Sequence, residues 1–464
     1  MNRIQSKLQY LFATALIGGL TLGSAVVAKA DPANPSTRKS PDWLRSAVVY
    51  EIFPRDFSQA GDLNAITARL DELKNLGVDV LWLMPIHPTG EKMKKGSVGS
   101  PYAVRDFYAI NPDYGTTNDF RRLVAQAHQR GLKVVMEIVA GHTAWDSVLM
   151  DQHPEFYMRD TNGAVIPPNP AWTDVAGLDY AKPVVRRYMI DMMKYWLQDF
   201  GVDGFRCDVG PNVPLDFWEA ARTELEKLNP QVIILADAGA KPELLTKAFD
   251  VDSSWGMINA LNTVMSSVTP ASYLKEMWEH NDQQFPKGAL HLRFTDSHEE
   301  IRAVARYSMN GALAAQVLML TLDGVPMFYN GMEVGDATES ADPALFEKMP
   351  VFWQSGGRPP LRDIYRDLIT LRKQNAAFYN GDVVWITNTA PEEVVTFLRQ
   401  DAKDTFLVLI NLSSIRVKGS VALSDADGFE PVNISGRSNP VDTHVPDFEL
   451  SGYGWSIYHR PASK

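Results

Sequence analysis

The sequence predicts an α/β fold: a (β/α)8 TIM barrel with a short lid subdomain after its third strand and a C-terminal antiparallel β-sandwich. Short apolar runs alternate with amphipathic stretches up to residue 375, which is the pattern of βαβ units around a parallel sheet. One connection, between Ala140 and Lys182, is far longer than the others. Past residue 375 the apolar runs follow one another without helical patterns between them, which favours an antiparallel sandwich.

The barrel strands are predicted from apolar runs that glycine or polar residues bound. Seven runs have this form: residues 48–53, 78–84, 133–139, 204–208, 232–237, 290–294 and 326–329. An eighth run, 248–251, has the weakest pattern and completes the count that a closed barrel needs. Helices are predicted at the amphipathic stretches 63–76, 117–130, 182–200, 215–228 and 361–375. Gly77, Gly131 and Gly201 end three of these helices just before the next strand.

These patterns divide the chain into a barrel at 47–378, a lid within it at 143–181, and a sandwich at 379–464. The lid connection carries Trp145, Trp172 and several prolines, and a loop of this length in a compact domain is usually functional. The sandwich strands are predicted at 383–386, 394–398, 405–412, 420–423 and 454–458.

The first thirty residues have the form of a secretory signal peptide. Arg3 and Lys7 precede an apolar run at 11–27, and Ala28-Lys29-Ala30 fits the small-x-small cleavage pattern. The alternative is a membrane anchor, but the run is rich in Gly, Ala and Thr and short for a span. We therefore expect cleavage before Asp31, a polar linker at 31–46, and an exported protein that is either periplasmic or secreted.

Composition limits the class of partner. The chain has 464 residues, a net charge of −11 and a pI near 5.4, which argues against nucleic acid or an anionic membrane as a partner once the signal is removed. A neutral substrate fits this charge better. The one cysteine, Cys207, allows no intramolecular disulfide after export. The sequence leaves the oligomeric state open.

An arginine and an aspartate two residues apart close the fourth predicted strand. Arg206 and Asp208 lie on the same face of that strand, and the arginine is expected to keep the carboxylate ionised. A buried ion pair is the structural alternative. Asp237 and Glu299 also lie at predicted strand ends, and acidic side chains at the carboxyl ends of barrel strands are typical of a catalytic site.

Several motifs occur in an order that resembles the alpha-amylase family (glycoside hydrolase family 13). They cover the chain from the first strand to the eighth: residues 49–57, 99–102 with 106–108, 135–142, 204–208, 235–238, 294–299, and 324–329 with Gly331 and Glu333. The resemblance implies retaining cleavage of α-glucosidic bonds in an α-linked glucan or oligosaccharide.

The resemblance also implies a role for each matching residue. By position, Asp208 is the nucleophile, Asp237 the general acid/base and Glu299 the carboxylate that stabilises the transition state. Arg206 orients the nucleophile. The remaining matches are substrate-binding residues: Tyr102, which stacks on the sugar, and His142 and His298, which hydrogen-bond it.

This chain departs from the family pattern at five positions. The family has Glu where this chain has Asp237, Asn-His-Asp where it has Ser297-His298-Glu299, and Asp and Asn where it has Glu137 and Gly141. A Glu-to-Asp exchange shortens the reach of the carboxyl group by roughly 1.5 Å. A misplacement of about 1 Å can cost on the order of 100-fold in rate.

Three functions remain open after these exchanges. The chain is a hydrolase with a re-tuned site, an α-glucosyl transferase or isomerase of the same family, or a catalytically weak relative that binds glucan. Every altered acidic position still carries an acidic residue, which favours the first function, a hydrolase. Glu137 is expected to form an ion pair with Arg206. Because Gly141 lacks the amide that holds calcium in many family members, no metal and no other cofactor is predicted.

Overall fold

The computed structural model describes residues 37–239, 241–354, 361–435 and 445–462, which belong to one compact unit. The predicted signal peptide at 1–30 and the first part of the predicted linker lie outside the described residues. The end of that linker forms a short 3-10 helix, η1 (Asp42–Ser46), whose Leu44 is buried. No helix within the described ranges has both the length and the apolar character needed to cross a bilayer.

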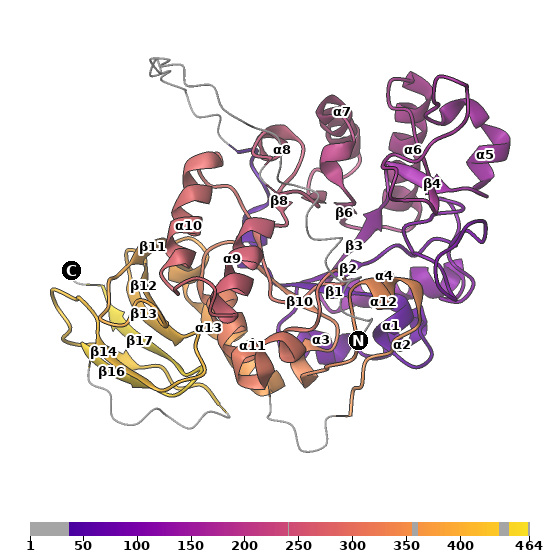
Figure 1. Cartoon of the computed structure of the whole chain (residues 1–464). Helices are drawn as coiled ribbons and strands as arrows, with labels where there is room; N and C mark the ends of the chain where they lie inside the picture. The colour runs from indigo at the N-terminus through magenta and orange to yellow at the C-terminus, as the bar shows by residue number, and fades with distance from the viewer. Residues whose placement is uncertain (1–36, 240, 355–360, 436–444, 463–464) are drawn as a thin grey trace, which may run out of the picture. The chain divides into compact units, whose positions relative to one another are not determined.

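Eight parallel strands form the predicted barrel (Figure 1). In chain order they are β1 (Val49–Ile52), β2 (Val80–Leu83), β3 (Lys133–Ile138), β6 (Gly204–Cys207), β7 (Ile233–Ala236), β8 (Val251–Asp252), β9 (Leu292–Arg293) and β10 (Val325–Tyr329). Neighbouring strands pair in this order except β8 and β9, which are the edges of the sheet, and β10 pairs with β1. A parallel bridge between Asp252 and His291 joins β8 to the start of β9 and closes the barrel.

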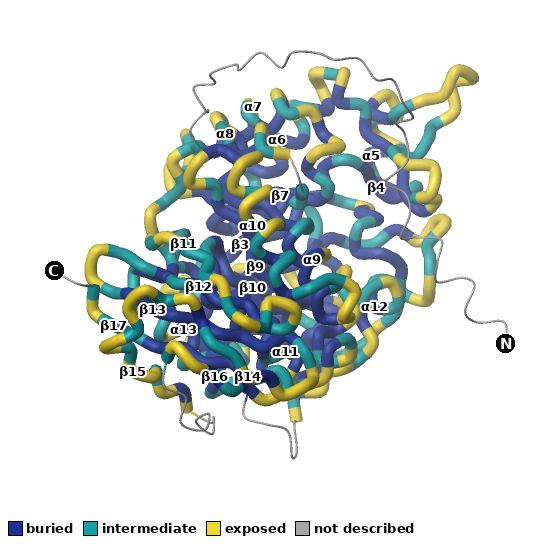
Figure 2. Tube along the Cα trace, turned by 60° about the vertical axis from the view of Figure 1, so that its left-hand side comes forward, coloured by how far each residue is buried: buried dark blue, intermediate teal, exposed yellow. Residues whose placement is uncertain are grey.

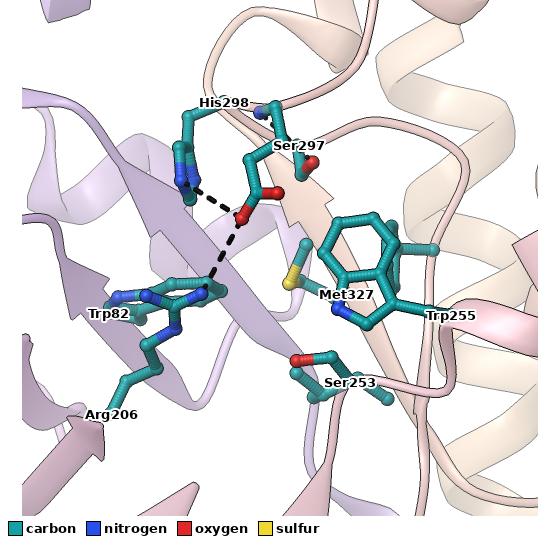
Figure 3. Close-up of a pocket in the computed structure, with 10 residues that line it drawn as sticks. Trp82, Arg206, Ser253, Trp255, Ser297, His298 and Met327 are labelled. Carbon is teal, nitrogen blue, oxygen red and sulfur yellow. Dashed lines mark hydrogen bonds and ion pairs between the residues drawn. The ribbon is translucent and has the colours of Figure 1, made fainter. Parts of the chain in front are cut away.

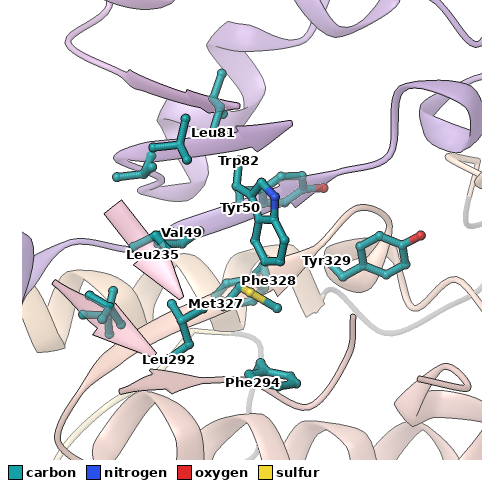
Figure 4. Packing of buried hydrophobic residues seen from close by; sticks show 14 of the residues in the cluster. Val49, Tyr50, Leu81, Trp82, Leu235, Leu292, Phe294, Met327, Phe328 and Tyr329 are labelled. Atoms are coloured by element: carbon teal, nitrogen blue, oxygen red, sulfur yellow. The ribbon is translucent and has the colours of Figure 1, made fainter. Parts of the chain in front are cut away.

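The interior of the barrel is filled by apolar side chains from its strands. Val49, Leu235, Leu292 and Met327 are all buried and belong to one core cluster (Figure 4). Gly204 opens β6 because a Cβ there would lie 1.9 Å from the carbonyl oxygen of the neighbouring strand β7. This packing makes the strands a rigid base for the side chains at their carboxyl ends.

Helices connect the strands. They are α1 (Pro54–Phe57), α2 (Leu63–Ala68), α3 (Leu70–Leu76), α4 (Thr117–Gln129), α6 (Pro183–Asp199), α7 (Leu215–Glu226), α8 (Leu244–Lys247), α9 (Trp255–Met265), α10 (Tyr273–Gln284), α11 (Ala303–Thr321), α12 (Asp342–Phe346) and α13 (Leu361–Gln374). The single helix predicted at 63–76 is wrong, because Arg69 leaves helical geometry and divides it into α2 and α3. The sequence did not assign α11, which is buried on most sides and bends at Ser308, so its apolar period is weak.

The long connection after β3 has secondary structure of its own. It contains a two-stranded antiparallel ribbon, β4 (His142–Ala144) with β5 (Val175–Gly177), a helix, α5 (Val148–Gln152), and a 3-10 turn, η2 (Pro154–Phe156). His142 begins this ribbon directly after the third barrel strand. The ribbon therefore holds one side of the barrel mouth.

The C-terminal part is antiparallel, as predicted. One sheet contains β11 (Asp382–Trp385), β12 (Val394–Gln400), β13 (Asp404–Asn411), β17 (Trp455–Pro461) and β15 (Glu430–Pro431), and a second contains β14 (Val417–Ser420) and β16 (Asp447–Leu450). A small core that includes Leu407, Leu409, Phe448 and Leu450 draws on both sheets. The strand predicted at 420–423 is wrong, because β14 ends at Ser420. β14 contains Gly419, over which the Phe448 ring lies. A glycine has no side chain to show the alternation of a strand, so the sequence does not reveal β14.

Burial follows the strands of both parts (Figure 2). Seven of the eight residues of β13 are buried, and Arg399 on the neighbouring strand β12 is fully buried. Its guanidinium donates to the carbonyl oxygen of Thr321, the last residue of α11, at 3.2 Å and to that of Gly381 at 3.1 Å. A charged side chain thus links the C-terminal sheet to a barrel helix.

We expect Arg399→Met to lower the free energy of unfolding by about 2 kcal/mol, because two carbonyl groups lose a charged donor in a buried place. Urea unfolding measures this. Arg416→Met is the matched control, because Arg416 is exposed and pairs with Glu449 at 3.1 Å, a contact worth about 1 kcal/mol or less. Equal losses in the two variants would contradict a role for Arg399 in joining the two parts.

Candidate active site

Arg206 lies at the centre of the site, inside β6, with its side chain almost fully buried. Its Nη1 contacts Glu137 and lies 3.0 Å from Oδ1 of Asp208. Its Nη2 lies 3.1 Å from Oδ2 of Asp237 and 3.7 Å from Oε1 of Glu299. The predicted ion pair between Arg206 and Glu137 is confirmed. Four acidic residues from β3 and from the ends of β6, β7 and β9 thus meet at one cation.

Asp208 follows β6 and is held by its backbone as well as by Arg206. Its amide donates to Ile138 of β3 at 3.0 Å. Burial raises the pKa of Asp208 well above its ordinary value, and the attraction of Arg206 does not offset this because Glu137, Asp237 and Glu299 add repulsion. Arg206 therefore contacts Asp208 as expected, but it does not bring the pKa of this carboxyl group down to its ordinary value. The single positive charge of Arg206 is shared among four carboxyl groups and does not offset the burial of Asp208.

Asp237 follows β7 and accepts hydrogen bonds at both oxygens. The Trp255 indole donates to Oδ1 at 3.0 Å, and the Val209 amide donates to Oδ2 at 3.2 Å. Burial raises the pKa of Asp237, but Arg206 and these two donors outweigh burial, so the pKa lies below its ordinary value. Sequence reasoning missed Trp255, since nothing in the sequence places the first residue of α9 beside the end of β7.

Tyr102 and His298 form a chain of polar contacts that ends inside β1. The Tyr102 hydroxyl lies 2.7 Å from Nε2 of His298, and Nδ1 of His298 contacts the carboxyl group of Glu51. Burial lowers the pKa of His298, but Glu51 and Glu299 outweigh it and hold the pKa well above its ordinary value. Glu51 is a site residue that sequence reasoning missed. An acidic residue within the apolar run 48–53 was the available signal.

The side chains at the barrel mouth line two neighbouring hollows. Glu299, Trp255 and His298 line the first, with Arg206 at its base (Figure 3). Asp208, His142 and Trp172 line the second, next to the lid ribbon. The rings of His142 and Trp172 lie 5.6 Å apart, and burial lowers the pKa of His142 to about 4, which keeps it neutral.

The structure therefore brings all the predicted site residues to one end of the barrel. Asp208, Asp237 and Glu299 each lie within 3.7 Å of Arg206. Tyr102 joins them through His298, and His142 lines the same hollow as Asp208. The arrangement combines carboxyl groups of different pKa with aromatic and imidazole side chains, which suits acid–base and nucleophilic chemistry on a polar, ring-shaped substrate.

The family model for the alpha-amylase catalytic domain matches residues 50–165 and 170–421. The chain belongs to the alpha-amylase family. This confirms the family and the class of enzyme, a glycosidase of the alpha-amylase type, that the motifs predict.

Individual relatives agree with this membership. The chain is 27% identical over 403 residues to alpha-amylase MalA of Haloarcula japonica, an alignment that covers 81% of this chain and 56% of the relative. It is 26% identical over 467 residues to a cyclomaltodextrinase of Geobacillus thermopakistaniensis, an alignment that covers 90% of this chain and 78% of the relative. The crystal structure of an alpha-amylase from Lactobacillus plantarum superposes with a TM-score of 0.79 at 29% identity and covers 90% of this chain and 99% of that one.

The calcium position of many alpha-amylase family members has no ligating side chain here at Gly141. Its carbonyl oxygen accepts a hydrogen bond from the Leu178 amide at 3.0 Å. Within the described ranges, no group of three or more His, Cys, Asp or Glu side chains is placed to hold a metal ion. The absence of a metal stays a prediction.

The raised pKa of Asp208 has a consequence for the pH dependence of an alpha-amylase family enzyme. A nucleophilic carboxyl group acts only when ionised, and kcat/KM reports ionisations of the free enzyme. We expect kcat/KM to fall as the pH drops through the raised pKa of Asp208, at a pH above the ordinary aspartate range near about 4. Initial rates between pH 4 and 8, with a check that the protein stays folded, measure this. A rate that is constant down to pH 4 contradicts it.

Proposed function

We propose that this protein hydrolyses α-glucosidic bonds of maltooligosaccharides or related α-glucans by double displacement, with retention at the anomeric carbon. The observation that carries the proposal is the meeting of Asp208, Asp237 and Glu299 at Arg206, at the carboxyl ends of barrel strands in an alpha-amylase catalytic domain. The names of the relatives, alpha-amylase and cyclomaltodextrinase, support an α-glucan as substrate.

The proposed chemistry divides the work among the carboxyl groups. The Asp208 carboxylate attacks the anomeric carbon and forms a covalent glycosyl intermediate. A second carboxyl group protonates the leaving oxygen and then takes a proton from the water that releases the sugar. By position in the family this second group is Asp237, with Glu299 stabilising the transition state. Glu51 helps to hold the pKa of His298 well above its ordinary value, so the imidazole is charged. It donates a hydrogen bond to a sugar hydroxyl or to Tyr102.

The rings near Asp208 support sugar binding in the second hollow. Trp172 and His142 line one wall of it, and Asn212 lines it as well. Aromatic faces and amide groups are the usual partners of a sugar ring, since the ring presents CH groups on its faces and hydroxyls on its edge. The lid ribbon that carries His142 thus contributes to substrate binding in this proposal.

One incubation tests the proposal against its two alternatives. Purified protein is incubated with maltoheptaose, pullulan, trehalose and sucrose, and the products are separated by chromatography. Hydrolysis releases shorter sugars and new reducing ends. Transfer or isomerisation gives longer or isomeric sugars without a matching rise in reducing ends. A glucan-binding relative gives no product, although calorimetry detects maltoheptaose binding, and this result would overturn the proposal.

Export is proposed separately, from the signal-like segment at 1–30. Expression of the full chain in a bacterial host should yield a periplasmic or secreted protein whose first residue is Asp31. N-terminal sequencing of the exported fraction measures this. A protein that keeps residues 1–30 and stays with the membrane fraction would favour an anchor instead.

A further inference from the structure

We infer that Glu51 is a positioning residue that holds His298 as an imidazolium, so that Nε2–H of His298 is a permanent hydrogen-bond donor to the sugar. The inference rests on the proposed hydrolysis, in which His298 hydrogen-bonds the substrate, and it adds a residue that acts through His298. It is drawn from a chain of side chains that runs between two buried carboxyl groups, Glu51 on β1 and Glu137 on β3.

Four side chains form this chain, and each contacts the next. Glu51 contacts Nδ1 of His298, and Nε2 of His298 lies 2.7 Å from the Tyr102 hydroxyl. The Tyr102 hydroxyl in turn hydrogen-bonds Glu137. Because Glu51, Glu137 and His298 are all buried, the protons in these contacts come from the members of the chain.

The two ends of the chain accept hydrogen bonds. Oε2 of Glu137 accepts from the Trp82 indole at 2.8 Å, and Oε1 contacts the Arg206 guanidinium. An indole N–H and a guanidinium have no acceptor to offer a protonated carboxyl group. Among the described residues, Glu51 forms an ion pair with His298 alone, and its second oxygen has no hydrogen-bond partner. His298 is therefore the one cation that compensates the buried Glu51.

The number of protons in the chain determines the state of His298. The chain has three links, and each link needs one proton. Tyr102 has a single hydroxyl proton, which it donates to Glu137, so the proton between Tyr102 and His298 must be on Nε2. The link to Glu51 needs another proton, and the imidazole holds it because a free imidazole, with a pKa of about 6.5, is a stronger base than a free glutamate, at about 4.3. With protons on both nitrogens, His298 is an imidazolium.

The charges that contact His298 agree with this count. Burial lowers the pKa of His298, but Glu51 and Glu299 outweigh burial and hold the pKa well above its ordinary value. Glu299 lies 3.4 Å from Nε2 with its side chain 41% exposed, whereas Glu51 is fully buried against Nδ1 (Figure 3 shows the contact with Glu299). Because water weakens the attraction of an exposed charge, Glu51 has the stronger effect on the imidazolium.

Three other charged groups face His298 from neighbouring strands. They are Glu137 on β3, Arg206 on β6 and Asp237 after β7. None of the three forms an ion pair with His298 among the described residues. The two carboxyl groups favour the imidazolium and the guanidinium disfavours it, so this outer set does not reverse the effect of Glu51.

A charged Nε2–H fixes what His298 can bind. It donates and offers no lone pair, so a sugar hydroxyl that replaces the Tyr102 oxygen must accept from it. A hydrogen bond from a charged donor is roughly twice as strong as one between neutral groups. Glu51 is too deeply buried to touch the sugar and thus contributes to binding through His298.

The charge of His298 can be observed directly. In the full chain labelled with 15N-histidine, we expect both ring nitrogens of His298 to have imidazolium shifts at pH 7.5, with the signals assigned from their loss in His298→Gln. Glu51→Gln keeps the size of the side chain and an acceptor for Nδ1 but removes the charge, so the imidazolium shifts should appear only at lower pH. A neutral His298 in the unaltered protein at pH 7.5, or the same titration in both proteins, would overturn the inference. The first of these outcomes does not depend on the folding of the variant.

Substrate binding tests the role of this charge. In the background of Asp208→Asn, in which calorimetry is free of turnover, Glu51→Gln should raise the Kd of maltoheptaose by about 10-fold at pH 8. The increase should be smaller at pH 5, since His298 regains its proton as the pH falls. Glu51→Asp keeps the negative charge and should not make the Kd depend on pH in this way. An increase that is equal at both pH values, or the same pH dependence in Glu51→Asp, would mean that Glu51 acts by packing and would overturn the inference.

Glu333→Gln is the matched control, because Glu333 is a fully buried glutamate beside β1 that contacts the Tyr50 hydroxyl at 2.9 Å and Arg362 at 3.1 Å. It should leave the His298 signals and the pH dependence of the Kd unchanged, and changes equal to those of Glu51→Gln would overturn the inference. If the protein neither binds nor cleaves maltoheptaose, the proposed function fails. The nitrogen signals then still decide whether Glu51 holds His298 as an imidazolium.

Discussion

Replacement of Asp208 by Asn is expected to abolish hydrolysis of α-glucans. The asparagine amide cannot attack the anomeric carbon, and the covalent intermediate does not form. Removal of a nucleophile from an enzyme with a covalent intermediate lowers kcat by about 10⁴-fold or more. The Asn side chain keeps the size of Asp208 and its contact with Arg206, so the site should stay assembled. Product release from maltoheptaose over long incubation, measured against the unaltered protein, gives the factor.

The same variant should remain folded and should still bind substrate. Because burial raises the pKa of Asp208, a neutral amide relieves a buried carboxyl group and should not lower the free energy of unfolding. Binding of maltoheptaose by calorimetry tests this, since a loss of binding would point to a damaged site.

Asp203→Asn provides a matched control. Asp203 precedes the other end of the same strand, where it pairs with Lys133 at 2.8 Å and lies apart from the carboxyl ends of the strands. Its replacement should affect stability and leave kcat within a small factor. Comparable loss of kcat in both variants, or activity in Asp208→Asn, would contradict the role of Asp208 as nucleophile.

The barrel could be predicted from the sequence because its signals are local. An apolar run followed by a helical pattern marks several βα units, and three of them also have a glycine at the helix end: Gly77, Gly131 and Gly201, which all have positive φ in the structure. The position of Arg206 two residues before Asp208 likewise needs only the period of a strand to place both on one face. The pairing of Arg206 with Glu137 was expected because Glu137 is an acidic residue inside a predicted apolar strand.

The electrostatics of the site could not be predicted in this way. The sequence gives the distance from Arg206 to Asp208 along one strand, but not that Glu137, Asp237 and Glu299 share the same guanidinium. That depends on the pairing and stagger of four strands. Burial is the largest cause of the raised pKa of Asp208, and the three other carboxyl groups add to it. The contact of Trp255 with Asp237 depends in the same way on where α9 begins.

Arg206 is the cation that the carboxyl groups of the site share. Its loss is expected to have the largest effect on stability. Its guanidinium is almost fully buried and contacts Glu137, Asp208 and Asp237, whose carboxyl groups are themselves buried or nearly so. Arg206→Met keeps an unbranched side chain of similar length and removes the charge. Removal of one partner from a buried ion pair costs about 3–5 kcal/mol, because the remaining charges stay buried without compensation.

The pH dependence separates this electrostatic cost from a loss of packing. Without the cation, the pKa values of Glu137 and Asp208, already raised by burial, rise further above those of the unfolded chain. A carboxyl group with a raised pKa in the folded state costs nothing while it is protonated in both states. Its cost appears as the pH rises above the pKa of the unfolded chain and grows until the folded pKa is passed. The stability deficit of Arg206→Met should therefore be larger at pH 8 than at pH 5.

Urea unfolding of both proteins at the two pH values measures this difference. Arg186→Met is the control for a salt bridge at the surface, since Arg186 pairs with the exposed Asp216 at 2.8 Å, and it should cost about 1 kcal/mol or less at either pH. A deficit for Arg206→Met that is equal at pH 5 and pH 8 would mean that the variant loses packing only. In that case Arg206 does not set the charge state of the carboxyl groups around it, and the arrangement proposed for catalysis loses its electrostatic basis.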